Sequence, residues 1–219
     1  GNRGRLTGKI QHAIRFTMII AIPSAVGLSV LAEPILKLLF DNIGKTDINL
    51  LRYGTLAVVV YSLSTITNAV LQGINQMRKP VIHALVSLVA HIAVLYVMIG
   101  VFKVGVYGVL VAYILFGLFI CLLNAATIRI TLSYRQELLR TFLLPAGASA
   151  VMGLAVFGIY KGIYALAKNN LISLIVAVLT GMIVYLVLLL LLKCLEEEDF
   201  YSIPFGRKLL RTARALHLI

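Results

Sequence analysis

Charge and cysteine are scarce in this sequence, whereas apolar residues are abundant. Of its 219 residues, 13% are charged and 61% are hydrophobic, and the mean hydropathy is +1.00. A soluble protein of this size needs far more charge on its surface. The composition also excludes disordered and collagen-like chains, and two cysteines do not make a disulfide scaffold. The sequence therefore indicates a membrane protein.

Motifs of the common catalytic and nucleotide-binding sites are missing from the sequence. It contains no G-x-S-x-G, no H-E-x-x-H, no phosphate-binding P-loop and no dinucleotide fingerprint. Cys121 and Cys194 lie far apart without metal-ligand spacing, so we expect two free thiols. We therefore expect neither an enzyme nor a bound cofactor or metal ion.

Six apolar stretches alternate with short polar segments. They are Phe16–Leu31, Leu50–Leu71, Val81–Ile99, Val104–Leu123, Thr141–Tyr160 and Leu171–Leu192. The last five match the roughly 20 residues that a helix needs to cross the hydrocarbon core, whereas the first is shorter and is extended by Ile35–Phe40. The pattern predicts an all-α polytopic membrane protein. Its expected parts are an interfacial lead-in helix at 1–15, a six-helix transmembrane lobe at 16–195 and an amphipathic tail at 196–219.

The net charge of +12 is better explained by membrane topology than by a nucleic-acid partner. With the amino terminus in the cytosol, fourteen of the 20 Lys and Arg residues fall on the cytosolic side. The positive-inside rule then predicts that both termini are cytosolic. In the tail, one helical face is basic, and we expect it to bind the anionic lipids of the inner leaflet. This face consists of Arg207, Lys208, Arg211 and Arg214.

Polar residues recur at helical spacing within two of the spans. On the second span they share one face, and they are Tyr61, Thr65, Asn68 and Gln72. Arg52 lies near the outer end of the same span. His91 in the third span lies about 15 Å deep at 1.5 Å per residue, close to the bilayer midplane. Such residues favour a wet cavity or hydrogen bonds between helices. His91 either packs as a neutral, hydrogen-bonded side chain or binds a headgroup or a proton.

Three further features concern how the helices bend and pack. Pro23 near the middle of the first span predicts a bend, which serves either packing or a transport hinge. In the fifth span, small residues predict a face that approaches another helix closely; they are Ala146, Ser149, Ala150 and Gly153. Glu33 and Lys37, four residues apart, predict an exposed ion pair.

Four segments carry a resemblance to a known family. They are AIPSAVGLSVLAEPILKLLF at Ala21–Phe40, AVLQGINQMRKPV at Ala69–Val81, GVYGVLVAY at Gly105–Tyr113 and IPFGRKLL at Ile203–Leu210. In these segments the chain resembles the carboxy-terminal half of the multidrug/oligosaccharidyl-lipid/polysaccharide exporter superfamily. More narrowly, it is similar to the stage V sporulation protein B branch of bacterial polysaccharide-biosynthesis flippases, which is related to the lipid II flippase of peptidoglycan synthesis.

The resemblance implies two six-helix lobes around a cavity that binds a polyprenyl-diphosphate-linked sugar and opens alternately to each side of the bacterial inner membrane. This chain, which opens with Gly1 rather than Met, would be a fragment that supplies the second lobe, and an amino-terminal lobe would be its partner. Arg52 approximately matches a cavity arginine of the lipid II flippase branch. The expected cavity residues are Arg52, Tyr61, Thr65, Asn68, Gln72 and His91.

Two other functions remain open at this point. A cation-coupled multidrug exporter of the same superfamily is expected to carry carboxylates within its spans, and the six apolar stretches hold none. A non-transporting membrane scaffold of envelope synthesis has no need for a polar stripe at the midplane. Both alternatives fit the sequence less well than the flippase.

Overall fold

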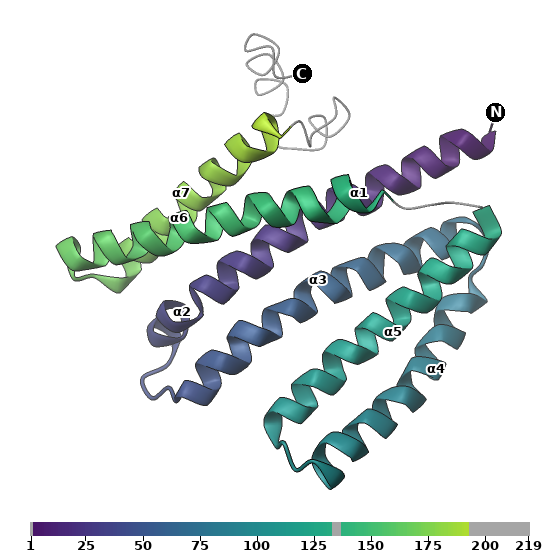
Figure 1. Ribbon diagram of the computed structural model, residues 1–219, viewed down its shortest axis with the longest axis horizontal. Coiled ribbons are helices and arrows are strands. Elements are labelled where there is room, and N and C mark those ends of the chain that lie inside the picture. Colours follow the sequence, from purple (N-terminus) through teal and green to yellow (C-terminus); the bar gives the residue numbers. More distant parts are fainter. Residues whose placement is uncertain (1, 133–136, 193–219) are drawn as a thin grey trace. The chain divides into compact units, whose positions relative to one another are not determined.

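The computed structural model describes residues 2–132 and 137–192, and within these it contains helices and no strand (Figure 1). The helices are α1 (Asn2–Val30), α2 (Ala32–Leu39), α3 (Lys45–Gly73), α4 (Arg78–Leu95), η1 (Tyr96–Val101), α5 (Val106–Leu132), η2 (Leu139–Leu143), α6 (Leu144–Ala167) and α7 (Asn170–Leu191). Six helical segments are long and apolar enough to cross a membrane. The predicted all-α polytopic class is therefore confirmed. The tail at 196–219 and its basic face of Arg207, Lys208, Arg211 and Arg214 lie outside the described residues.

Several helices extend beyond the apolar stretches that predicted them. α1 runs unbroken from the expected lead-in segment through the first span and past Pro23. The expected extension at Ile35–Phe40 belongs to the separate helix α2. α5 continues to Leu132, whereas the apolar stretch ends at Leu123. Hydropathy marks the part of a helix that meets lipid, and these helices continue past it.

The chain divides into two compact units, and the division runs through α1. Unit 1 comprises Gly1–Ala21 and Gly44–Glu137, and unit 2 comprises Ile22–Ile43 and Leu138–Ile219. The boundary within α1 thus falls just before Pro23, the residue predicted as a bend or hinge.

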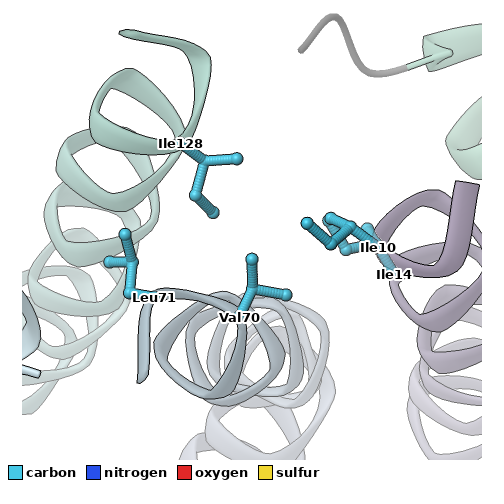
Figure 2. Packing of buried hydrophobic residues seen from close by; sticks show 5 residues of the cluster. All are labelled: Ile10, Ile14, Val70, Leu71 and Ile128. Carbon is cyan, nitrogen blue, oxygen red and sulfur yellow. The ribbon is translucent and has the colours of Figure 1, made fainter. Parts of the chain in front are cut away.

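In unit 1, α5 lies between α3 and α4 (Figure 1). Figure 2 shows that side chains from three helices meet in an apolar cluster at one end of this unit. They are Ile10 and Ile14 of α1, Val70 and Leu71 of α3, and Ile128 of α5. The first part of α1 is therefore held against the ends of α3 and α5 by apolar burial.

In unit 2, α6 packs against α7, and α2 also contacts α7. A Cβ atom added at Gly181 of α7 would lie 2.5 Å from Cγ2 of Val156 on α6, so only glycine allows this approach. The predicted small-residue face of α6 is correct in part, since Ser149 and Gly153 are buried but Ala146 and Ala150 are exposed. The packed face is rotated and also contains Ala148, Met152 and Val156.

The ends of the helices carry several local features. The predicted ion pair on α2 is present, with Lys37 Nζ at 2.6 Å from Glu33 Oε1. Asn169 caps α7, because its side-chain oxygen accepts from the amides of Leu171 and Ile172. Lys103 before α5 and Lys168 after α6 have φ values of 52° and 50°, in the left-handed region that favours glycine.

Candidate functional site

The polar side chains of unit 1 converge on α5 in two groups. The first group, here named the Asn124 cluster, consists of Thr67, Asn68, His83, Asn124 and Thr127. It joins α3, α4 and α5, and Asn124 at its centre is fully buried. Because amides buried in hydrocarbon are costly unless they are bonded, this cluster fixes how the three helices pack.

Every polar atom of the Asn124 side chain is used. Its amide nitrogen lies 3.0 Å from Thr67 Oγ1 and 2.8 Å from Asn68 Oδ1 and donates to both. Its oxygen therefore accepts from His83 Nδ1 at 2.7 Å, which assigns the proton of a neutral His83 to Nδ1. The other ring nitrogen then accepts from the Thr127 hydroxyl at 3.3 Å.

The second group lies farther toward the start of α5. It is here named the Tyr113 cluster and consists of Tyr61, His91, Ala112, Tyr113 and Phe116. Tyr61 donates to the Tyr113 carbonyl at 3.1 Å, and the two rings stack with centroids 4.6 Å apart. From α4, His91 Nδ1 lies 2.9 Å from the carbonyl of Ala112, and its ring meets Phe116 edge-on. A carbonyl only accepts, so His91 Nδ1 carries a proton and Nε2 of the neutral ring is an acceptor.

The polar stripe of α3 is divided between packing and exposure. Tyr61 and Asn68 are half-buried and bonded to α5, whereas Thr65 and Gln72 are exposed. The Thr65 hydroxyl donates to the Tyr61 carbonyl of its own helix at 2.8 Å. We name Thr65 and Gln72 the polar edge of α3; it is the part of the stripe that remains free to meet water or a ligand.

Arg52 is not brought together with this stripe. It is exposed near the start of α3, which runs as one helix to Gly73. Arg52 and Tyr61 are nine residues apart, or about two and a half turns at 3.6 residues per turn, so they point to opposite sides. His91, the predicted cavity residue of α4, lies at the Tyr113 cluster, to which Tyr61 of the stripe also belongs.

Sequence reasoning missed the centre of the Asn124 cluster. The apolar stretch that predicted the fourth span ends at Leu123, one residue before Asn124, so the amide fell outside the predicted span. The signal that identifies it is periodic, because the buried residues Gly117, Cys121, Asn124 and Ile128 recur at helical spacing along α5.

The chemistry available in these groups is hydrogen bonding. Within the described ranges, no group of three or more His, Cys, Asp and Glu residues is arranged to hold a metal ion. Ser87, between His83 and His91 on α4, is fully buried and its hydroxyl has no hydrogen-bond partner there. The exposed side chains of the polar edge and the half-buried His91 are the predicted cavity residues near these groups whose polar atoms are least engaged in packing.

Comparison with known proteins gives one finding about family. Residues 1–97 match the family model described as MatE, which covers just under half of the chain. Over these residues the chain is similar to that family. No curated protein and no solved structure gave a match to the chain.

Proposed function

We propose that this chain forms one lobe of a flippase that moves polyprenyl-diphosphate-linked sugars across the bacterial inner membrane by alternating access. Three observations support the proposal: the MatE match, the six membrane-spanning segments and the polar edge of α3. The polar edge carries most of the argument. Gln72 is exposed in the last turn of α3, and Thr65 exposes its hydroxyl oxygen about two turns earlier on the same face, although that hydroxyl donates to its own helix. A polar edge that continues from the end of the helix into the apolar stretch favours a water-filled cleft.

A cleft of this kind answers the physical problem of such a substrate. Sugar hydroxyls and a diphosphate lose their hydration in hydrocarbon, at several kcal/mol for each unsatisfied group. In the proposed cycle the headgroup passes through the cleft while the polyprenyl chain stays in lipid. An inside-negative potential favours outward movement of the anionic headgroup by about 2.3 kcal/mol per charge per 100 mV.

The proposed roles differ among the predicted cavity residues. Thr65 and Gln72 hydrogen-bond sugar hydroxyls, and His91 Nε2 accepts a hydrogen bond from another hydroxyl. Tyr61 and Asn68 hold α3 against α5 and so orient the polar edge. Arg52 points away from the polar edge, so it does not hold the diphosphate while the sugar lies there; its proposed role is to attract the anionic headgroup near the start of α3.

Alternating access also needs a second lobe and a place to bend. We propose that a second six-helix lobe faces the polar edge and completes the cleft. Pro23 is the proposed hinge, because proline removes a backbone hydrogen bond within α1 and the boundary between the two units lies beside it. The cytosolic placement of both termini remains part of this proposal.

The scarcity of carboxylates in the described spans favours the flippase over a cation-coupled multidrug exporter. The six described spans contain one carboxylate, Asp47, which lies in the first turn of α3. Its Oδ2 accepts from the amide of Gly44 at 2.8 Å and so caps the helix. A coupling carboxylate is therefore not found in the interior of these spans.

Apolar substitution of the polar edge tests the proposal. Thr65→Val and Gln72→Leu, made singly and together in the complete transporter, remove the hydroxyl and the amide without disturbing the α3–α5 contacts. With each hydrogen bond worth about 1 kcal/mol, we expect about a fivefold loss of translocation rate for each substitution. The rate is measured with a fluorescent polyprenyl-diphosphate sugar in proteoliposomes.

The control is Thr131→Val, which makes the same change at an exposed threonine of α5. It should leave the rate unchanged. Unchanged translocation by the Thr65→Val/Gln72→Leu protein would contradict the cavity assignment.

A further inference from the structure

An open pocket of about 440 Å³ lies at the turn between α3 and α4, entirely within unit 1. Its lining residues are Asn75, Gln76, Met77, Arg78, Lys79 and Ile82. Arg78 and Lys79 are exposed, and within the described part of the chain no ion pair joins either of them to a carboxylate. The pocket therefore presents two cations that are available to an anion.

The α3 side of this pocket is a fixed turn. The amide of Gln76 donates to the Leu71 carbonyl at 2.8 Å, and that of Asn75 donates to the Gln72 carbonyl at 3.1 Å. With Asn75 in the left-handed region at a φ of 62°, these two bonds form a Schellman motif. Leu71, where the motif begins, is fully buried in the apolar cluster of Figure 2.

The α4 side is fixed as well. Pro80 and His83 in the first turns of α4 are buried, and His83 is bonded to Asn124 of the Asn124 cluster. The amide of Lys79 donates to the Gln76 carbonyl at 3.0 Å and so closes the turn. Both walls are thus held by the core of unit 1, and a ligand bound between them pays little to order the backbone.

The remaining wall of the pocket is apolar. Met77 is 66% exposed and Ile82 is 49% exposed, beside the two cations. Inorganic phosphate gains nothing from such a wall. An anionic lipid does, because its phosphate and its first acyl carbons lie next to each other at the membrane surface.

We propose that the α3–α4 pocket binds the phosphate headgroup of an anionic phospholipid, with Arg78 and Lys79 on the phosphate and Met77 and Ile82 against the lipid's apolar part. The guanidinium of Arg78 suits two phosphate oxygens at once, and Lys79 adds a point charge. No lining residue belongs to the polar edge of α3, although Gln72 of that edge accepts from the Asn75 amide in the same turn, and the proposal does not depend on which substrate is transported.

Fluorescence quenching in the full chain tests the site. The sequence contains no tryptophan, so Met77→Trp places a single reporter in the pocket, and Ile82→Trp provides a second one. The protein is reconstituted in phosphatidylcholine vesicles that contain either brominated phosphatidylglycerol or brominated phosphatidylcholine. With two cations near the headgroup, we expect the anionic lipid to be preferred about thirtyfold.

Removing the charges of the pocket then tests whether Arg78 and Lys79 cause the preference for the anionic lipid. In the reporter background, Arg78→Gln and Lys79→Gln should each lower the preference about fivefold, and the double variant should abolish it. The matched control is Lys9→Gln with Arg129→Gln, which removes one exposed lysine and one exposed arginine outside the pocket. This control should retain most of the preference, and circular dichroism checks that every variant is folded.

Three results would overturn the proposal. Equal quenching by both brominated lipids would mean that the pocket has no preference for anionic headgroups. An equal loss in the control would mean that diffuse surface charge, rather than the pocket, attracts the lipid. Relief of the quenching by millimolar inorganic phosphate would mean that the pocket recognises a free anion.

Discussion

Units 1 and 2 solve the same packing problem with different side chains. Water provides no driving force between helices inside a membrane, so close approach and hydrogen bonds must hold them together. Both units have a glycine at the contact. A Cβ added at Gly117 of unit 1 would lie 2.8 Å from Val60 Cγ1, and one at Gly181 of unit 2 would lie 2.5 Å from Val156 Cγ2.

The two units differ in where their buried polar groups donate. In unit 1, Asn124 donates across the contact to α3 and accepts from α4. In unit 2, the buried hydroxyls of Ser149 and Ser173 donate back to carbonyls of Pro145 and Asn169, four residues earlier in the chain. Hydrogen bonds between helices specify a register, whereas a serine bonded to its own helix mainly contributes small size. Unit 2 also has hydrogen bonds between helices, but they meet at the start of α7, where Tyr160 donates to Asn170 and Asn170 donates to the Pro34 carbonyl. The polar edge of α3 therefore sits in the unit whose bonds between helices centre on a fully buried amide.

Filling the glycine contact of unit 2 should have the largest effect. Gly181→Val overlaps Val156, and we expect the free energy of unfolding to fall by about 3 kcal/mol. Titration of mixed micelles with SDS, followed by circular dichroism, measures the loss. Gly158→Val on α6 is the control, since a Cβ there has nothing within 4 Å. If the control is equally damaging, steric fit at the contact is not the cause.

Removing the central amide of unit 1 should lower the free energy of unfolding more than removing a buried hydroxyl of unit 2. Asn124→Leu breaks three bonds at an average of about 0.6 kcal/mol each in lipid, so we expect a loss of about 2 kcal/mol. Ser149→Ala in unit 2 should cost less than about 0.5 kcal/mol, because its bond stays within the segment that contains it. The same SDS titration compares them. Equal losses of unfolding free energy would mean that the bonds between helices in unit 1 stabilise no more than a serine bonded to its own helix.

Backbone strain outside the contacts should affect both units alike. Lys103→Gly in unit 1 and Lys168→Gly in unit 2 place glycine where φ is positive, and each should raise the free energy of unfolding by about 1 kcal/mol. Ala150→Gly, at an exposed helical position of α6, should instead lower it by about 1 kcal/mol. A loss of stability in either lysine variant would show that the lysine side chain matters more than φ.

The exposed ion pair of α2 should have the smallest effect. The hydrogen bond to Glu33 and its charge raise the pKa of Lys37 above the ordinary value of 10.5. A raised pKa means that the pair stabilises the fold at neutral pH and loses this contribution as the pH rises through the raised pKa. The side chains are 58% and 48% exposed, so water screens the pair.

We therefore expect Lys37→Gln to cost a few tenths of a kcal/mol at pH 7 and nothing at strongly alkaline pH. Unfolding titrations at both pH values check this, with Lys45→Gln as an exposed control. A cost that persists at alkaline pH would assign the effect to packing of the lysine stem.

The sequence predicted the number of spans well and the direction of their faces less well. Hydropathy suffices for the spans because the hydrocarbon core demands a fixed length of apolar helix. It does not distinguish a neighbouring helix from lipid, so Ala146 and Ala150 were expected in a contact and are exposed. Helical periodicity placed Asn68 on the correct face of α3, but it could not show that Asn124 of α5 would bind it.

Spacing within one helix was the more reliable guide. The Glu33 and Lys37 pair was confirmed because four residues on one helix fix the geometry without tertiary structure. The Asn124 and Tyr113 clusters depend on the register between helices, which a single sequence does not reveal. Arg52 is the opposite case, because its nine-residue spacing from Tyr61 places it on the other side of one continuous helix without any tertiary information.

The interleaving of the two units has a consequence for biosynthesis. Segment Ile22–Ile43 belongs to unit 2, yet its partners begin only at Leu138. At about 5 to 20 residues per second, a ribosome takes roughly 5 to 20 s to supply them. Asn170 then donates to the Pro34 carbonyl at 2.9 Å across this gap. Until Asn170 has been synthesised, segment Ile22–Ile43 is inserted without its partners from unit 2. During the same interval the ribosome supplies α5, the main partner of α3.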